Sequence, residues 1–156
     1  MKRNKPSKRA ARKRDAVRKK TERAAVAKKR AKEFRVTHSA ASGFAKGLRG
    51  YFEYRDLGIK GATRGKVVSH VIRALPGEAP HGEWHWHDCD VQFIYVLKGW
   101  AKFEYEGVGE ILMQAGTCFY QPPGIRHREI GHSDDVEMLE VVAPANFKTY
   151  TAQELG

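Results

Sequence analysis

The sequence has little cysteine and no long hydrophobic segment. Its two cysteines, Cys89 and Cys118, are too few among 156 residues to form a disulfide framework. We therefore expect two free thiols and a reducing, cytoplasmic location. No apolar run approaches the ~18 residues of a membrane span. The basic N-terminus is not followed by the apolar stretch, about 7–15 residues long, of a secretory signal. The composition therefore favours neither a disulfide-stabilised secreted domain nor a membrane span.

Acidic residues are scarce in the first 35 positions. Residues 1–35 hold 17 Lys/Arg and 3 Asp/Glu, a net charge of +14, whereas residues 36–156 have a net charge of −3. Large apolar side chains are also rare in this segment, so a helix there would have no apolar face to bury. We expect a basic tail over 1–35 that is disordered or transiently helical, with helix most favoured at residues 15–34.

Three roles are compatible with this basic tail. Residues 2–35 could contact nucleic acid or another polyanion, such as an acidic membrane surface. An arginine-rich organellar transit peptide is a second role, although such peptides usually have more serine and a better apolar face. A solubilising extension, or one produced by a wrongly chosen start codon, is the third. The sequence leaves these three alternatives open.

The rest of the chain has room for one domain built of short strands. Residues 36–50 are rich in serine and glycine and predict a linker or arm, 51–150 the domain, and 151–156 a C-terminal tail. Short apolar or alternating segments separated by glycine and proline turns predict an all-β, antiparallel sandwich or barrel. We expect strands at 52–57, 66–75, 83–87, 91–97, 100–105, 110–114, 117–121, 126–130 and 136–142.

One predicted strand, at 91–97, is apolar on both faces. Gln92, Ile94 and Val96 would share one face, and the residues between them the other. A strand with one face in water alternates more cleanly. We therefore expect the outer face to be covered by a second sheet, by the 36–50 arm or by a partner subunit, and we expect a homodimer.

The most informative pair of residues is His85 and His87. Residues two apart in a strand project from the same face, roughly 6.6–7 Å apart along the backbone. Two imidazoles so placed can converge on one metal ion with bonds near ~2.1 Å. Trp86, between them, must point the other way. Two histidines in a His-x-His pair are more often ordinary polar surface residues than metal ligands. The neighbouring sequence must therefore show which of the two applies here.

The context of this pair resembles the two sequence motifs of the cupin superfamily. The first motif has a glycine, a spacer, His-x-His, a glutamate and a glycine; the second has a glycine, Pro-x-Gly, a histidine and an asparagine. The match extends over residues 75–131, with the spacing of small single-domain cupins. The matching positions are His85, His87, Gly99, Gly116, Pro122, Gly124 and His127.

Three positions depart from the cupin motifs. The opening glycine is displaced, with Gly77 and Gly82 as alternatives, and Gly131 replaces the asparagine, which alters a turn. Gln92 stands at the glutamate position, and this change bears on chemistry. Glutamate would bring a full negative charge to a metal, whereas glutamine offers a neutral carbonyl oxygen. An ion held by three histidines would therefore keep more of its positive charge and act as a stronger Lewis acid.

The resemblance implies a jelly-roll β-barrel with one divalent metal at its mouth. The ligands it carries over are His85, His87 and His127, with Gln92 either a fourth ligand or a hydrogen-bond partner of the ligands. Imidazole-rich sites suit Fe, Zn, Ni, Mn or Cu, and the sequence does not choose among them.

The resemblance also implies a small-molecule ligand, and two classes of function fit it. One is a metal-dependent enzyme, dioxygenase-like or an isomerase or lyase, acting on a small organic substrate. The other is a non-catalytic metal-holding module that binds or senses a small molecule, with the basic tail on a polyanion. Near the motifs, the catalytic candidates are His81, Glu83 and Tyr120. The candidates for substrate binding are Ile94, Val96 and Tyr120.

Overall fold

The computed structural model describes residues 8–151, and the predicted C-terminal tail lies almost entirely outside this range. The chain divides into two compact units, residues 1–35 and 36–156, which are described separately. The helices are α1 (Lys8–Glu33), the 3₁₀ turn η1 (Ser39–Ala41) and α2 (Ile59–Ala62). The strands are β1 (Ala45–Lys46), β2 (Phe52–Asp56), β3 (Val68–Ala74), β4 (His85–Asp88), β5 (Val91–Lys98), β6 (Trp100–Tyr105), β7 (Gly109–Gln114), β8 (Cys118–Gln121), β9 (His127–His132), β10 (Glu137–Ala143) and β11 (Lys148–Thr151).

The described part of the first unit is dominated by helix α1. The tail was expected to be disordered or transiently helical; disorder is wrong for these residues, and the helix extends beyond the 15–34 segment where it was most favoured. The helix has 26 residues, well beyond the ~12–15 at which isolated helices become marginal, and consists mostly of the strong helix formers Ala, Lys and Arg. Residues 11–32 are all exposed, and Arg18 lies 3.7 Å from Glu22 one turn later. Backbone propensity thus forms the helix without a buried face. No helix in the described part of the chain is long and apolar enough to cross a membrane.

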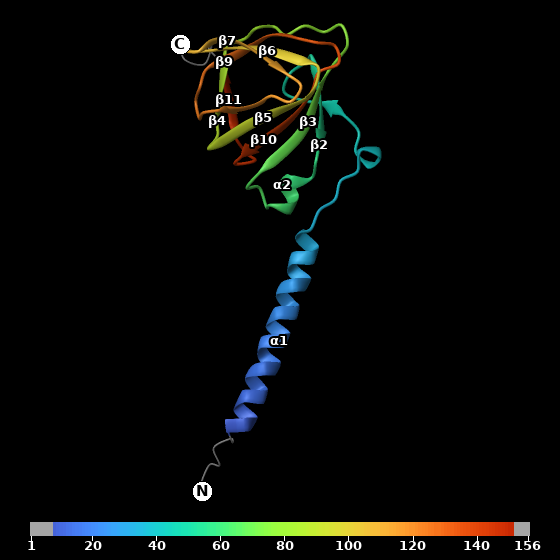
Figure 1. The fold of residues 1–156 in the computed structure, drawn as a ribbon, viewed down its shortest axis with the longest axis vertical. Helices are drawn as coiled ribbons and strands as arrows, with labels where there is room; N and C mark the ends of the chain where they lie inside the picture. The colour runs from blue at the N-terminus through green and yellow to red at the C-terminus, as the bar shows by residue number, and fades with distance from the viewer. Residues whose placement is uncertain (1–7, 152–156) are drawn as a thin grey trace. The chain divides into compact units, whose positions relative to one another are not determined.

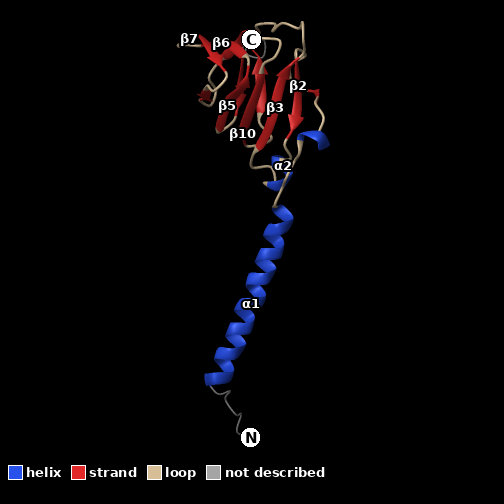
Figure 2. Cartoon of the chain, turned by 45° about the vertical axis from the view of Figure 1, so that its right-hand side comes forward, coloured by secondary structure: helices blue, strands red, loops and turns tan. Residues whose placement is uncertain are grey.

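The second unit is a two-sheet β-sandwich, which confirms the predicted antiparallel all-β class (Figures 1 and 2). One sheet has the order β1-β2-β3-β10-β5-β8 and the other β11-β4-β9-β6-β7, and all the paired strands are antiparallel. Apolar side chains of both sheets form one core between them, including Val96 and Met138 of the first sheet and Ala101 and Phe103 of the second. This core leaves room for a cavity at one end.

Most strands lie within a few residues of their predicted positions, but three short elements were missed. The predicted linker contains β1, which pairs with β2. The segment between the predicted strands 52–57 and 66–75 contains the one-turn helix α2. Strand β11 pairs with β4 at the edge of the second sheet. Each is four residues or shorter, so its hydrophobic periodicity is too brief to recognise in sequence.

The turn between β5 and β6 requires a glycine. Gly99 has a φ of +66°, and a β-carbon there would lie 2.9 Å from the Val136 α-carbon, closer than such atoms approach. The glycine that ends the first motif therefore allows β5 to lead directly into β6 of the other sheet.

The alternation predicted for β5 is present, but its outer face is open among the described residues. Gln92, Ile94 and Val96 are buried, whereas Tyr95 is 40 % and Leu97 46 % exposed. The second sheet packs on the inner face instead, because the buried residues of β5 share the core with β6. Neither the arm nor the second sheet covers Tyr95 and Leu97.

Candidate metal centre

Two neighbouring strands bring three histidines to one point on the inner face of the second sheet. His85 and His87 project inward from β4, and Trp86 between them stacks on Tyr150 with ring centroids 5.2 Å apart. His127 begins β9 and is the direct cross-strand partner of His85. All three histidines are buried, at 3–7 % exposure.

The hydrogen bonds of the three rings leave Nε2 as the atom able to bind an ion. Each Nδ1 makes a hydrogen bond to an oxygen atom. For His85 and His127 this oxygen is a backbone carbonyl, which can only accept, so their Nδ1 carries the proton. The Thr149 hydroxyl can accept the same proton from His87. The oxygens are the Glu83 carbonyl, 2.9 Å from His85; the Thr149 hydroxyl, 2.9 Å from His87; and the Ile125 carbonyl, 3.0 Å from His127.

The protonation state of the cluster also suits a metal. Burial, followed by the neighbouring His127, lowers the pKa of His85 and of His87 from 6.5 to about 3. Burial likewise lowers the pKa of His127. All three rings are therefore neutral near pH 7, which is the form that coordinates a metal ion.

The distances fit a shared ion. One ligand atom from each of the three rings lies within 4.8 Å of the other two. Nitrogens bonded to one ion at ~2.1 Å are about 3.0–3.4 Å apart in octahedral or tetrahedral geometry. Closing the widest pair would therefore shift each nitrogen by less than ~1 Å. The residues present thus fit a divalent transition metal, although the geometry does not select which one.

Two glutamine side chains adjoin the cluster. Gln92 Nε2 donates to Glu140 Oε1 at 3.0 Å, which turns the Gln92 carbonyl oxygen away from that carboxylate. Gln121 Nε2 donates to His127 Nε2 at 3.0 Å, so an ion on that nitrogen would have to displace the Gln121 amide. Both glutamines are 2 % exposed. Gln92 is therefore inward, as predicted, and held by hydrogen bonding.

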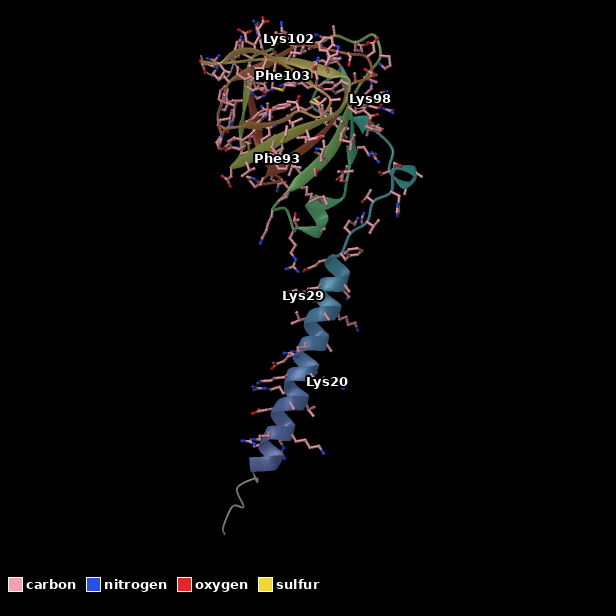
Figure 3. All side chains as sticks on the ribbon, viewed as in Figure 1. Lys20, Lys29, Phe93, Lys98, Lys102 and Phe103 are labelled. Carbon is pink, nitrogen blue, oxygen red and sulfur yellow. The ribbon has the colours of Figure 1, made fainter. Side chains whose placement is uncertain are left out.

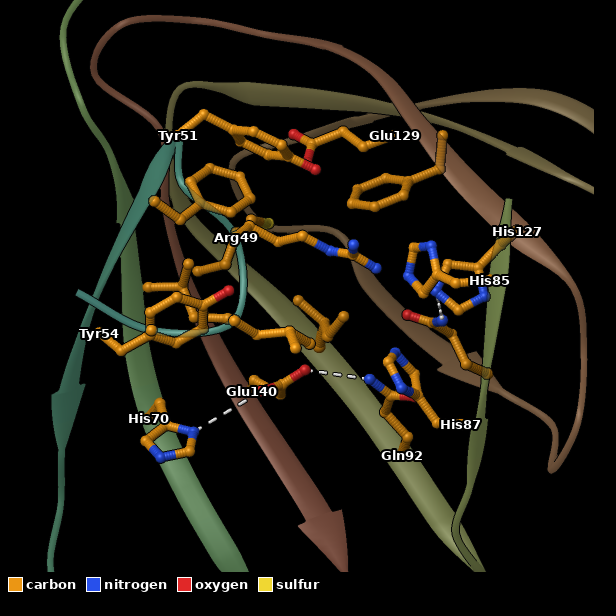
Figure 4. A pocket seen from close by; sticks show the side chains of 18 of the residues that line it. Arg49, Tyr51, Tyr54, His70, His85, His87, Gln92, His127, Glu129 and Glu140 are labelled. Carbon is orange, nitrogen blue, oxygen red and sulfur yellow. Dashed lines mark hydrogen bonds and ion pairs between the residues drawn. The ribbon is translucent and has the colours of Figure 1, made fainter. Parts of the chain in front are cut away.

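A cavity of about 300 Å³ opens beside the three histidines (Figure 4). Two acidic side chains line it, and both have partners. Glu129 contacts His132 Nδ1 at 2.9 Å and accepts a hydrogen bond from the Tyr51 hydroxyl. Glu140 accepts the Gln92 hydrogen bond described above. Burial raises the pKa of Glu129, and the contact with His132 opposes this rise.

The structure brings some of the predicted site residues to this cavity and not others. Ile94 lines it, but Val96 is 0 % exposed within the core. Tyr120 is 58 % exposed and pairs with Phe93, whose side chain alternates with the inward residues of β5. His81 is exposed with its ring 5.7 Å from Tyr51, and Glu83 is exposed with its carboxylate 3.6 Å from Arg49.

Several polar residues of the cavity were missed in the sequence, including Glu129, Glu140 and Arg49. Glu129 and Glu140 could have been found, because strand alternation places Glu129 on the face of His127 and Glu140 on that of Met138. Arg49 carries no such signal, because it lies in the glycine-rich arm.

A β-bulge at position 130 places His132 on the same face of β9 as Glu129, which allows the two side chains to meet.

Taken together, fold and site define a small antiparallel β-sandwich with a buried three-histidine cluster inside it. Residues 71–142 match the family model of the cupin domain, and this match contains all three histidines. The match confirms the resemblance to cupins that the sequence motifs indicated for this segment. No curated protein matches the chain in sequence.

Solved structures share the fold at low sequence identity. KdgF from Halomonas sp. is 16% identical with a TM-score of 0.57, over 70% of this chain and 94% of that one. The polyketide cyclase RemF from Streptomyces resistomycificus is 16% identical with a TM-score of 0.63, over 76% and 85%. The iron(II) form of HppE is 16% identical with a TM-score of 0.57, over 70% and 60%. These similarities establish the fold alone.

Proposed function

We propose that the sandwich is a metal-dependent enzyme that rearranges or cleaves a small organic substrate by proton transfer. The observation that carries this proposal is the buried cluster of His85, His87 and His127 opening into a cavity. A cavity of about 300 Å³ lies at the lower end of the range for small-molecule sites. Acidic and phenolic side chains line the same cavity and favour proton transfer over oxygen chemistry.

The residues have separable roles in this proposal. His85, His87 and His127 would hold the ion through Nε2, and the oxygens behind their rings would fix the ring orientation. The ion would supply a Lewis acid that stabilises negative charge developing on a substrate oxygen. Glu129 and Tyr51 share a hydrogen bond at the cavity wall, where they can hold a proton next to a bound substrate.

Metal analysis followed by turnover in heavy water tests the proposal. We expect about one transition metal per purified full-length chain, and its loss in His127→Ala. The metal-loaded protein should exchange carbon-bound hydrogen for deuterium in at least one of a panel of diketones, hydroxy acids and thiols, without consuming oxygen. Oxygen uptake would replace this proposal with a dioxygenase, and binding without turnover would replace it with a binding or sensing module.

We also propose that helix α1 contacts a polyanion such as nucleic acid. Residues 8–33 contain 13 Lys/Arg and 3 Asp/Glu, and side chains such as those of Lys20 and Lys29 extend from the helix (Figure 3). Binding that neutralises phosphates weakens steeply as salt rises. We expect the full chain to bind RNA or DNA at low salt and a chain lacking residues 1–33 to lose this binding. Equal binding by both chains would refute the role of the helix.

A homodimer through the open face of β5 is a further expectation. Tyr95 and Leu97 expose apolar surface there, next to the exposed Cys118 and Tyr120 of β8. Contiguous apolar patches of this kind mark association surfaces. Sedimentation should show a dimer that Tyr95→Glu converts to a monomer, and a monomeric wild-type chain would contradict the expectation.

A further inference from the structure

Two positive side chains line the cavity, the exposed Lys46 and the largely buried Arg49, and the histidine cluster does not explain Arg49. Arg49 lies in the turn between β1 and β2, and its side chain extends into the cavity toward the histidines (Figure 4). Burial is the main cause of the lowered pKa of His85, His87 and His127, and the positive charge of Arg49 adds to it, as expected for a cation near the cluster. The side chain is 16 % exposed.

The backbone of Arg49 is held firmly in this position. Its carbonyl accepts a hydrogen bond from the Phe52 amide at 3.1 Å, and its own amide donates to the Tyr54 hydroxyl. Gly47, two residues earlier, lies flat on the Tyr54 ring, where a β-carbon would overlap the ring. The arm is therefore packed so that Arg49 enters the cavity from a fixed point, which lowers the cost of ordering it on binding.

The guanidinium is incompletely paired. Nη2 is buried and has no hydrogen-bond partner, and Nη1 has only Glu83, 3.6 Å away and 44 % exposed. Neither acid of the cavity accepts a hydrogen bond from Nη2: Glu129 contacts His132 and Tyr51, and Glu140 contacts Gln92. A buried, unpaired guanidinium N–H is costly, so the site favours an acceptor from outside the chain.

We infer that Arg49 is the anchor for the carboxylate of a small monocarboxylic acid, which is the substrate class of this cavity. The inference rests on the proposed function, because the part of the acid opposite its carboxylate would face the ion held by the histidines. A guanidinium and a divalent ion in one cavity repel each other, and an anion between them relieves that repulsion. A singly charged carboxylate suits one guanidinium, whereas a phosphate would bring more negative charge beside Glu129 and Glu140.

Paired acids and amides test the inference. The probes are pyruvate, glycolate and benzoate, their amides, and inorganic phosphate, titrated into metal-loaded full-length protein by ligand-observed NMR. We expect wild type to bind at least one acid about tenfold or more tightly than its amide. Arg49→Gln should reduce that preference to about one, and Arg49→Lys should keep part of it because the charge remains without the planar fork.

A matched control comes from Lys46, which lies at the same cavity but is exposed. Lys46→Ala should keep the acid preference within about threefold, because an exposed charge contributes little. Thermal unfolding of each variant checks folding, and Arg49→Lys provides the test if Arg49→Gln does not fold. The inference is overturned if no acid binds, if phosphate binds more tightly than the acids, or if Arg49→Gln keeps the wild-type preference.

Metal content measured on the same samples separates this inference from the proposed function. If the protein binds no metal but prefers acids in an Arg49-dependent way, the proposed function is refuted and the carboxylate site is supported. If the protein binds one metal per chain without an Arg49-dependent preference, only the carboxylate site is refuted.

Discussion

Helix α1 and the β-sandwich belong to one chain but are stabilised in opposite ways. The helix has an excess of ten positive charges over residues 8–33, buries almost nothing, and depends on backbone propensity. The sandwich depends on apolar side chains shared by two sheets, and burial beside this core keeps three histidines neutral. A change at one residue should therefore matter little in the helix and greatly in the sandwich.

The largest expected difference between the two regions comes from truncating an apolar side chain in each. Met138 is 2 % exposed in the core, so Met138→Ala should lower the free energy of unfolding by about 2–5 kcal/mol. Val26 is 49 % exposed on the helix, so Val26→Ala should leave that value unchanged. Urea unfolding followed by tryptophan fluorescence reports the sandwich, because all three tryptophans lie there. Similar losses in both variants would refute the contrast.

A second difference concerns metal binding. His87→Ala should lower metal affinity at least ~100-fold, equivalent to about 2.7 kcal/mol, because one of three ligands is lost. The matched control is His70→Ala, which removes another histidine of the same cavity that is outside the cluster. Calorimetric titration with Zn²⁺ measures both variants. Wild-type affinity in His87→Ala, or equal losses in the two variants, would remove His87 from the ligand set.

The third difference is a dependence on pH that only the sandwich should show. The unfolded chain protonates His85 and His87 near pH 6.5, whereas the folded metal-free protein does so only near pH 3. The unfolded state therefore binds more protons between these values, and stability falls as pH is lowered through this window, by up to about 1.4 kcal/mol per pH unit for each ring. Urea unfolding in EDTA at pH 7, 6 and 5 measures this fall.

Helix α1 contains no histidine, so its circular dichroism should stay constant from pH 7 to 5. Replacing His85 and His87 together by glutamine should reduce the dependence of stability on pH to the part contributed by His127. A slope unchanged by this double substitution would show that other groups cause it.

The smallest expected effect is confined to the helix. Ala25→Gly should destabilise α1 by about 1 kcal/mol, because glycine gains more backbone freedom in the unfolded chain. The helical signal should fall, while the urea midpoint of the sandwich should stay the same. A shift of that midpoint would show that the two units are energetically coupled.

The fold and the histidine cluster could be predicted because their signals are local. Alternation placed Gln92, Ile94 and Val96 on the inner face of β5, and two-residue spacing placed His85 and His87 together. The cupin motifs added His127 from a distant strand. A persistent helix was not predicted for the basic segment, only a transient one at 15–34, because the segment has no apolar face to bury; high helix propensity over 26 residues is enough without one.

The sequence alone determined the alternation of the strands, the spacing of the histidines and the separation of charge between the two regions, since each depends only on neighbours along the chain. Tertiary structure decided which side chains surround the cluster. Arg49 reaches the histidines because β1 pairs with β2 and Gly47 packs on Tyr54, and Glu129 meets Tyr51 from the other sheet's side of the cavity. These contacts depend on how turns and strands pack in three dimensions, and no local pattern records where the side chains will meet.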